Sequence, residues 1–177
     1  MSFLCCISVL KTLNLDLKKI SKINHLLYNI EGRGKIHKVK RYNKVFNLID
    51  ESYNANPSST KNAIKNFSEI KTNGKKYFIF GDMLELGKKT HFFHKDISKF
   101  INNSKVDKTF TFGKKTLTTY KYLNKKKKGN VFQNLGDFDL IMKDLLKHDD
   151  YLMIKGSNAS NVKKFSKALI GGYKNVI

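Results

Sequence analysis

The sequence predicts an α/β fold in which a mainly parallel β-sheet is flanked by helices. Short apolar runs alternate with amphipathic segments along most of the chain, a glycine-containing connector separates them from a purely helical start, and polar segments follow several of the apolar runs. With 177 residues, of which 40% are hydrophobic, the chain is long enough for one domain with its own core.

The first thirty residues are predicted to be helical. Apolar residues recur there at spacings of three and four, the pattern of helices with one buried face: Leu4, Ile7, Leu10, Leu13, Leu17, Ile20, Ile23 and Leu27. Asn14 and Asp16 should divide this segment into two helices, because short polar side chains compete for backbone hydrogen bonds. The stretch Glu-Gly-Arg-Gly at 31–34 ends it, since glycine gives a connector backbone freedom. We therefore expect a domain boundary at Gly32, with residues 1–32 and 33–177 in different domains.

The apolar runs that follow the connector are predicted to be strands. They are 45–49, 77–80, 109–112, 151–154 and, more weakly, 130–132, and residues 35–40 would add an edge strand. Helical patterns lie at 58–70, 91–103, 114–123, 138–147 and 160–170. Strands that alternate with helices of this length imply right-handed crossovers, and therefore a Rossmann-like, mainly parallel sheet with helices on both faces.

The formal net charge of +21 raises nucleic acid as a partner, but the composition argues against it. Only Arg33 and Arg41 among the 35 basic residues are arginines, and arginine is favoured for bidentate contacts to phosphate and guanine. We therefore expect most lysines on solvated faces, and the lysine run 125–128 in a solvated loop.

Cysteine content and the start of the chain indicate a cytoplasmic protein without membrane insertion. Cys5 and Cys6 are adjacent and are the only cysteines, so they cannot form a disulfide framework or a spaced metal site. The apolar opening has no basic leader and no small-residue cleavage site, so we expect it to be a buried helix.

Three polar segments directly follow predicted strands, where ligands bind in parallel α/β sheets. The segment 50–58 carries two carboxylates and short amides, and its Asn-Pro-Ser end is also a good helix start. The segment 81–87 places Asp82 and Glu85 on a turn bounded by glycines, which could bind a substrate amine or order a loop. The Lys-Gly-Ser at 155–157 precedes a helix, where an anion is favoured.

In this order and spacing, the segments resemble the carboxyl-terminal domain of the Mur ligase family, especially its MurF-type members. That group has a Gly-Arg connector, then Asp-Asp-Ser-Tyr-Asn-Ala-Asn-Pro, then Gly-Asp-Met-Leu-Glu-Leu-Gly with a downstream histidine, then Lys-Gly-Ser. The corresponding positions here are 32–33, 50–57, 81–87 with His94, and 155–157. The resemblance covers nearly the whole chain, and the first thirty residues resemble the last helices of the family's central ATPase domain.

The resemblance implies an ATP-dependent ligase whose substrates are UDP-N-acetylmuramoyl-tripeptide and D-alanyl-D-alanine. The nucleotide-binding residues would be Arg33, Glu51, Asn54 and Asn56. The substrate-binding residues would be Asp82, His94, Lys155, Gly156 and Ser157. For His94 the alternative is a histidine packed on a helix face. Neither a catalytic residue nor a metal site is expected within this chain.

The chain also departs from the family pattern. Glu51 stands where an Asp is expected, and Asn158 stands where an Arg commonly follows Lys-Gly-Ser, which weakens one anion contact. The phosphate-binding sequence G-x-x-x-x-G-K-[ST] does not occur. ATP and Mg²⁺ would therefore be bound mainly by the central domain, which a separate gene could encode, and the chain alone is not expected to ligate. The alternative functions are a non-catalytic basic nucleic-acid-binding module and an interaction module.

Overall fold

The computed structural model describes residues 2–14 and 31–171, and contacts divide the chain into two units, residues 1–30 and 31–177. The first unit contains helix α1 (Ser2–Thr12). It ends at Thr12, two residues before Asn14, whose φ of 52° is left-handed, so a helix end beside Asn14 agrees with the prediction, while the division into two helices stays a prediction. Asp16 and the rest of the predicted helical segment lie outside the described residues. The domain assigned to each part of the chain stays a prediction.

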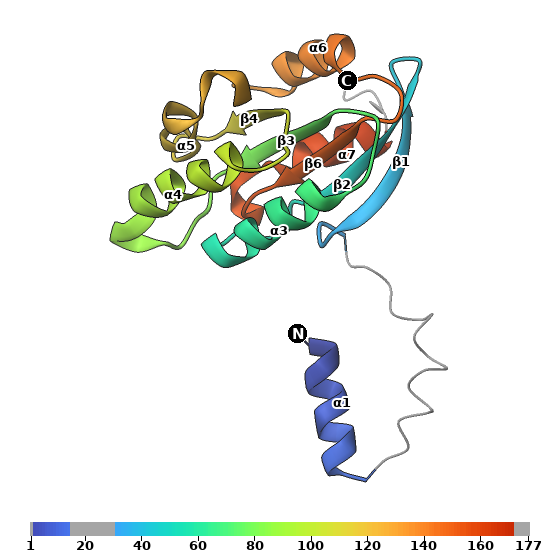
Figure 1. The fold of residues 1–177 in the computed structure, drawn as a ribbon, viewed down its shortest axis with the longest axis vertical. Coiled ribbons are helices and arrows are strands. Elements are labelled where there is room, and N and C mark those ends of the chain that lie inside the picture. Colours follow the sequence, from blue (N-terminus) through green and yellow to red (C-terminus); the bar gives the residue numbers. More distant parts are fainter. Residues whose placement is uncertain (1, 15–30, 172–177) are drawn as a thin grey trace. The chain divides into compact units, whose positions relative to one another are not determined.

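The second unit is built on a six-stranded sheet with the order β1-β2-β6-β3-β4-β5 (Figure 1). Its strands are β1 (Lys35–Arg41), β2 (Lys44–Glu51), β3 (Lys76–Gly81), β4 (Lys108–Phe112), β5 (Lys128–Phe132) and β6 (Tyr151–Lys155). β1 pairs with β2 in antiparallel fashion, and all other neighbours are parallel. The predicted α/β class, the mainly parallel sheet and the edge strand at 35–40 are confirmed.

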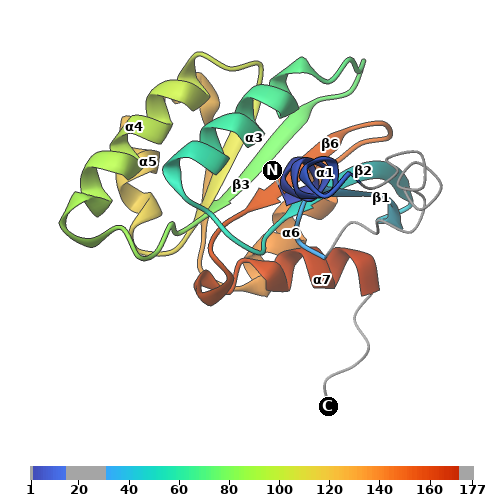
Figure 2. The same ribbon diagram turned by 90° about the horizontal axis from the view of Figure 1, so that it is seen from below.

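Helices cover both faces of this sheet (Figure 2). One face carries α3 (Pro57–Glu69), α4 (Thr90–Asn102) and α5 (Thr116–Tyr122), and the other carries α6 (Leu135–Leu145) and α7 (Lys163–Gly171). Each of the five was predicted with boundaries that differ by up to three residues. The largest shifts are at the starts of α6 and α7.

Strand β3 shows how the two cores form. Its six residues are all buried, and their side chains alternate between the faces. Tyr77 and Ile79 pack into the core below α6 and α7, whereas Phe78 and Phe80 pack into the core below α3 and α4. A strand that is apolar on both sides requires helices on both faces, and the topology supplies them.

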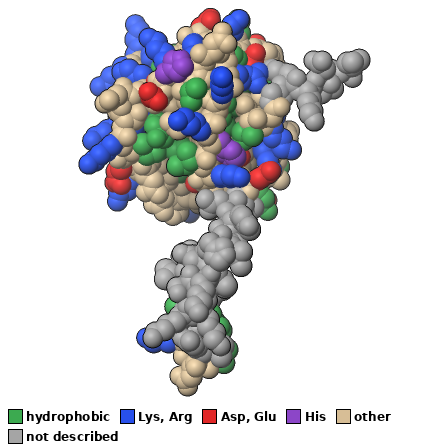
Figure 3. Space-filling model, turned by 90° about the vertical axis from the view of Figure 1, so that its right-hand side faces the viewer, with side chains coloured by type: hydrophobic (Ala, Val, Ile, Leu, Met, Phe, Trp, Pro, Cys, Tyr) green, Lys and Arg blue, Asp and Glu red, His purple; other side chains and the backbone are tan. Residues whose placement is uncertain are grey.

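The prediction that residues 125–128 form a solvated loop is wrong in part. Lys125–Lys127 form a short 3₁₀ helix, and Lys128 begins β5. The Lys127 ammonium donates to the carbonyls of Ser104 and Val106, and burial lowers its pKa. Lys125 and Lys126 are exposed, as predicted. Figure 3 shows the side of the molecule that lies at the right of Figure 1, and its Lys and Arg side chains are spread out rather than gathered in one stripe.

Candidate functional site

The candidate site lies where neighbouring parallel strands end. Sheet register pairs Glu51, the last residue of β2, with Lys155, the last residue of β6, and it pairs Lys155 with Phe80 of β3 on the other side. The segments that follow these three strands therefore begin at the same edge of the sheet, where α/β proteins bind ligands.

Lys155 is the charged residue at the centre of this edge. Its side chain is 2% exposed, and its Nζ lies 3.3 Å from Glu51 Oε2 and 3.0 Å from the carbonyl oxygen of Asn54. Burial lowers the pKa of Lys155, while the neighbouring Glu51 carboxylate opposes this shift. The ammonium is thus held in place by protein oxygens on two sides.

A first hollow of about 250 Å³ opens next to this ion pair. It is lined by Gly32, Arg33, Glu51, Tyr53, Asn54, Asn56, Ser59 and Lys155. The Arg33 guanidinium lies over the Tyr53 ring, 4.4 Å from its centroid. Gly32 has a φ of +75°, and a Cβ at this position would lie 2.8 Å from the Tyr53 backbone nitrogen, so this approach requires glycine.

The structure brings together all four residues predicted to bind the nucleotide, and it adds Lys155 from the predicted substrate group. Two of the four also have local roles. Asn56 caps α3 by accepting from Ser59 N at 2.8 Å, so the predicted helix start is confirmed. The Asn54 side chain accepts from the next backbone nitrogen, that of Ala55, at 2.8 Å.

A second hollow of about 310 Å³ shares Tyr53 and Asn54 with the first. Its other lining residues are Leu84, Glu85, Ser157, Asn158 and Ala159. Glu85 is exposed and has a left-handed φ of 61°. The two hollows therefore lie next to each other at this edge of the sheet, with Tyr53 and Asn54 in the lining of both.

The Lys-Gly-Ser segment does not form the helix N-terminus expected from the sequence. A three-residue 3₁₀ turn follows it, and α7 begins only at Lys163. The backbone nitrogen of Ser157 donates to the Asp82 carbonyl at 3.0 Å, and its hydroxyl accepts from Leu84 N at 3.0 Å and donates to Ala55 O at 3.3 Å. Ser157 therefore connects the segments that follow β2, β3 and β6.

The side chain of Asp82 is used within the protein. Its Oδ1 accepts from the backbone nitrogens of Lys115 and Thr116, at 3.0 and 2.8 Å, where α5 begins. Gly113 allows the close approach, because a Cβ there would lie 2.5 Å from an Asp82 carboxylate oxygen. Of the two alternatives that the sequence left open, this geometry favours the ordered loop, while the substrate role of Asp82 stays a prediction.

His94 is fully buried on α4. Its Nε2 accepts from Met83 N at 3.2 Å, and its Nδ1 lies 2.9 Å from the Thr90 carbonyl oxygen. These partners indicate the neutral ring with its proton on Nδ1, and burial lowers the pKa of His94 accordingly. The packed-histidine alternative matches this geometry, and a contact between His94 and substrate stays a prediction.

Gly156 contributes space rather than a polar group. A Cβ on Gly156 would lie 2.7 Å from Val162 Cγ1 and 2.9 Å from Gly81 Cα. A Cβ on Gly81 would lie 2.7 Å from Val162 Cβ, so both glycines make room for the segment that precedes α7.

Two residues of this edge were not selected from the sequence. Tyr53 is 41% exposed and lines both hollows. Asp50 is buried, and its Oδ1 accepts from the backbone and hydroxyl of Ser52 and from the hydroxyl of Ser166. The sequence could have indicated the role of Asp50, because a carboxylate at the end of an apolar strand is buried there and must accept hydrogen bonds from buried donors.

Within the described residues, no group of three or more His, Cys, Asp or Glu side chains is placed to hold a metal ion. Among the same residues, no helix is long and apolar enough to cross a membrane.

Known proteins with similar sequences are ligases of one family. The family model described as "Mur ligase, glutamate ligase domain" matches residues 33–158. A UDP-N-acetylmuramoyl-tripeptide--D-alanyl-D-alanine ligase of Buchnera aphidicola subsp. Baizongia pistaciae is 35% identical over 135 residues, which are 75% of this chain and 28% of that protein. The enzyme of the same name from Buchnera aphidicola subsp. Acyrthosiphon pisum is 32% identical over 165 residues, 89% of this chain and 33% of that protein.

Solved structures share the fold. The MurF ligase of Thermotoga maritima, crystallised in complex with ADP, superposes with a TM-score of 0.75 at 20% identity, covering 92% of this chain and 35% of that one. The chain thus spans about a third or less of the length of these relatives.

Proposed function

The chain belongs to the Mur ligase family, and from this membership we propose that it is the carboxyl-terminal portion of a ligase of peptidoglycan precursor synthesis. The ligase would use ATP to join D-alanyl-D-alanine to UDP-N-acetylmuramoyl-tripeptide in the cytoplasm. These substrates are the ones named for the relatives that match most of this chain.

The observation that carries the proposal is the cluster of Arg33, Glu51, Asn54 and Lys155 around one hollow. Together with the Tyr53 ring, over which the exposed Arg33 guanidinium lies, this cluster places a cation, a partly exposed carboxylate and an aromatic ring at the carboxyl ends of parallel strands. This combination suits a nucleotide, because arginine binds phosphate, a carboxylate accepts from ribose hydroxyls and a ring supports a base or a guanidinium.

The residues present fit only part of ATP. Arg33 is exposed and could reach a phosphate, whereas the Lys155 ammonium is already bound to two protein oxygens. The sequence has no phosphate-binding loop, and its described residues offer no metal cluster. ATP phosphates and Mg²⁺ would therefore be bound mainly by another domain, with this edge closing over the nucleotide from the other side.

In the proposed reaction, the terminal carboxylate of the tripeptide attacks the γ-phosphorus of ATP, which releases ADP and forms an acyl phosphate. The amine of D-alanyl-D-alanine then attacks the acyl carbon and loses a proton, so that an amide bond forms and inorganic phosphate leaves. The groups of this chain bind and orient. Arg33 would contact the nucleotide, while Lys155 fixes the Glu51 carboxylate and the Asn54 backbone so that both keep their positions in the hollow. The second hollow, with Ser157 and Asn158, would receive part of the peptide substrates.

A hybrid enzyme tests this function directly. Residues 31–177 would replace the matching portion of the Bacillus subtilis relative, which is 43% identical over 67 residues. Formation of the pentapeptide product from the tripeptide and D-alanyl-D-alanine would be followed by mass spectrometry, with ATP hydrolysis as a second readout. A folded hybrid that ligates D-alanine but not D-alanyl-D-alanine would refute the proposed substrate, and the unfused chain should show no ATP turnover.

A further inference from the structure

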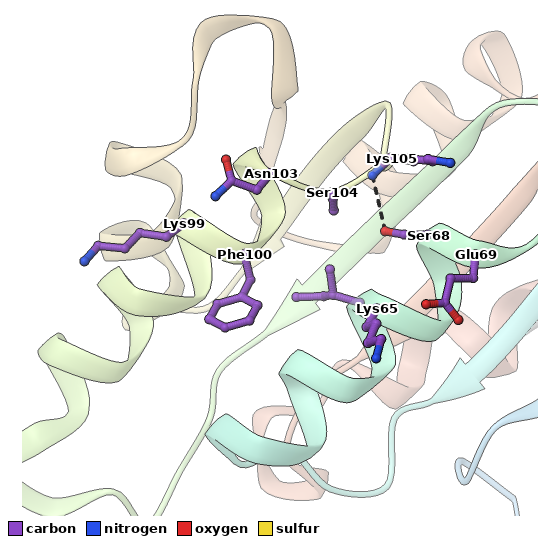
Figure 4. Close-up of a pocket in the computed structure, with 9 residues that line it drawn as sticks. Lys65, Ser68, Glu69, Lys99, Phe100, Asn103, Ser104 and Lys105 are labelled. Carbon is purple, nitrogen blue, oxygen red and sulfur yellow. Dashed lines mark hydrogen bonds between the residues drawn. The ribbon is translucent and has the colours of Figure 1, made fainter.

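A hollow of about 400 Å³ lies between α3 and α4, outside the site described above (Figure 4). Both helices and the loop after α4 contribute to its lining, which includes Ile64, Lys65, Lys99, Phe100, Asn103 and Lys105. We call this surface the α3–α4 groove.

The α3–α4 groove lies at the opposite edge of the sheet from the candidate site. Each helix begins after the carboxyl end of one strand and ends before the next strand starts, and the groove is lined by the last turns of both helices. Ser68 joins these ends, because its hydroxyl accepts from Lys105 N at 3.2 Å and its carbonyl accepts from Lys76 Nζ at 2.8 Å. A molecule bound in the groove would leave the nucleotide edge open.

The floor of the groove is apolar and partly uncovered. Phe100 is 42% exposed and points from α4 into the space beside α3 (Figure 4). Phe92 lies two turns earlier on α4, is 63% exposed and lines a smaller adjoining hollow that also includes Lys99. The two rings are eight residues apart, which is about 12 Å along a helix. Exposed aromatic side chains at this spacing form a stripe that an amphipathic helix can cover.

The rim of the groove is cationic. Lys65, Lys99 and Lys105 are exposed, and none of them forms an ion pair within the described residues. Lys61 is different, because it pairs with Asp96 at 2.6 Å and lies over the Phe100 ring. Glu69 is a carboxylate among the lining residues of the groove, and Asp96, which lines the adjoining hollow, is neutralised by its pair with Lys61. A ligand that covers the rings would therefore place its flanking groups next to three free ammonium groups.

We propose that the α3–α4 groove docks an acidic amphipathic helix of a partner protein. Its apolar face covers Phe92 and Phe100, and its carboxylates face Lys65, Lys99 and Lys105. A second copy of this chain does not fit, because it brings the same net charge of +21. The apolar floor also favours a helix over a nucleic acid, whose binding rests on its phosphates.

The test measures a labelled peptide on the full chain by fluorescence anisotropy. The peptide is about 14 residues long, with Leu or Phe at helical spacing on one face and Glu on both flanks. A scrambled peptide of the same composition is the control for charge alone. The ordered peptide should bind at least about tenfold more tightly than the scrambled one.

Matched variants locate the site. The first double variant carries Lys65→Glu and Lys99→Glu. Its control carries Lys125→Glu and Lys126→Glu, which change the charge equally at exposed lysines elsewhere. The first double variant should weaken peptide binding by about tenfold more than the control. Phe100→Ala should weaken it about tenfold, and Leu140→Ala, an equally neutral change at an exposed residue of α6, should not.

Several results would overturn the proposal. These are equal binding of the ordered and scrambled peptides, equal loss in both double variants, or no peptide binding below about 1 mM. An oligonucleotide that depends on Lys65 and Lys99 while the peptide does not would assign the groove to nucleic acid instead. Circular dichroism verifies that each variant is folded. If the double lysine variant is unfolded, the comparison of Phe100→Ala with Leu140→Ala tests the proposal instead.

Discussion

The end of β3 and the shared end of β2 and β6 differ in how they use their polar side chains. At the β3 end, Asp82 and His94 are buried, and their polar atoms bind backbone groups. At the β2–β6 end, Arg33 and Glu51 border an open hollow, with Lys155 fixed behind them. The same family pattern therefore contains residues that organise the edge and residues that remain available to a ligand.

Asp82→Ala should show the largest effect, which is a loss of stability caused by a change at the β3 end. It removes an ionised acceptor of two backbone hydrogen bonds and leaves both nitrogens poorly satisfied, so we expect a loss of roughly 3 kcal/mol in the free energy of unfolding. Urea unfolding followed by circular dichroism measures it, and Asp82→Asn, which keeps one acceptor, should lose less. A change below about 0.5 kcal/mol for Asp82→Ala would contradict the assigned structural role of this carboxylate.

Lys155→Ala should act mainly on turnover at the β2–β6 end. In the hybrid enzyme, loss of the charge-assisted bonds to Glu51 and Asn54 should lower kcat/KM by about ten- to a hundredfold, that is, by about 1.5 to 3 kcal/mol. Lys126→Ala, at an exposed lysine, is the control and should change the rate little. If both variants are equally active, Lys155 has no part in the site.

The pH dependence of stability should report on His94. Burial lowers its folded pKa below the unfolded value, so the unfolded state takes up a proton that the folded state does not. The stability that comes from keeping His94 neutral is fully present above about pH 6.5. It is lost as the pH falls toward the folded pKa, and the free energy of unfolding then decreases by at most about 1.4 kcal/mol per pH unit. Unfolding at pH 7 and 5.5 should show a smaller pH-dependent loss for His94→Gln than for the unsubstituted chain. Identical losses would place the titration elsewhere.

Arg33→Ala should have the smallest effect on the fold. The side chain is exposed and lies over the Tyr53 ring, so the free energy of unfolding should change by only about 0.5 kcal/mol. Nucleotide affinity of the hybrid should nevertheless fall several-fold, measured by calorimetry with ADP. Unchanged affinity would remove Arg33 from the proposed nucleotide contacts.

Sequence patterns predicted the sheet well because the strands are apolar on both sides and the helices have clear buried faces. They predicted that the selected residues lie at one edge of the sheet, because the segments after parallel strands share that edge, and its role as the functional site stays a prediction. They could not predict which polar atoms are free. The Lys-Gly-Ser segment has the pattern of a helix start. In the structure, however, the Ser157 backbone nitrogen donates a hydrogen bond to the Asp82 carbonyl, a tertiary contact that the local sequence does not indicate. Lys127 reads as a loop lysine, yet two carbonyls of the α4–β4 connection lie within its reach.

The lysines of the outer strands have a consequence for behaviour at high concentration. In the described part of the chain, β1 and β5 are the two borders of the sheet, and such borders can add a strand from a neighbouring molecule and begin a fibril. Strand β1 carries three exposed lysines, Lys35, Lys38 and Lys40, and β5 begins with Lys128. Two copies meeting edge to edge would align like charges, so stacking is discouraged at low ionic strength. Concentrated salt, by screening those charges, should be the condition under which this protein first forms strand-paired aggregates.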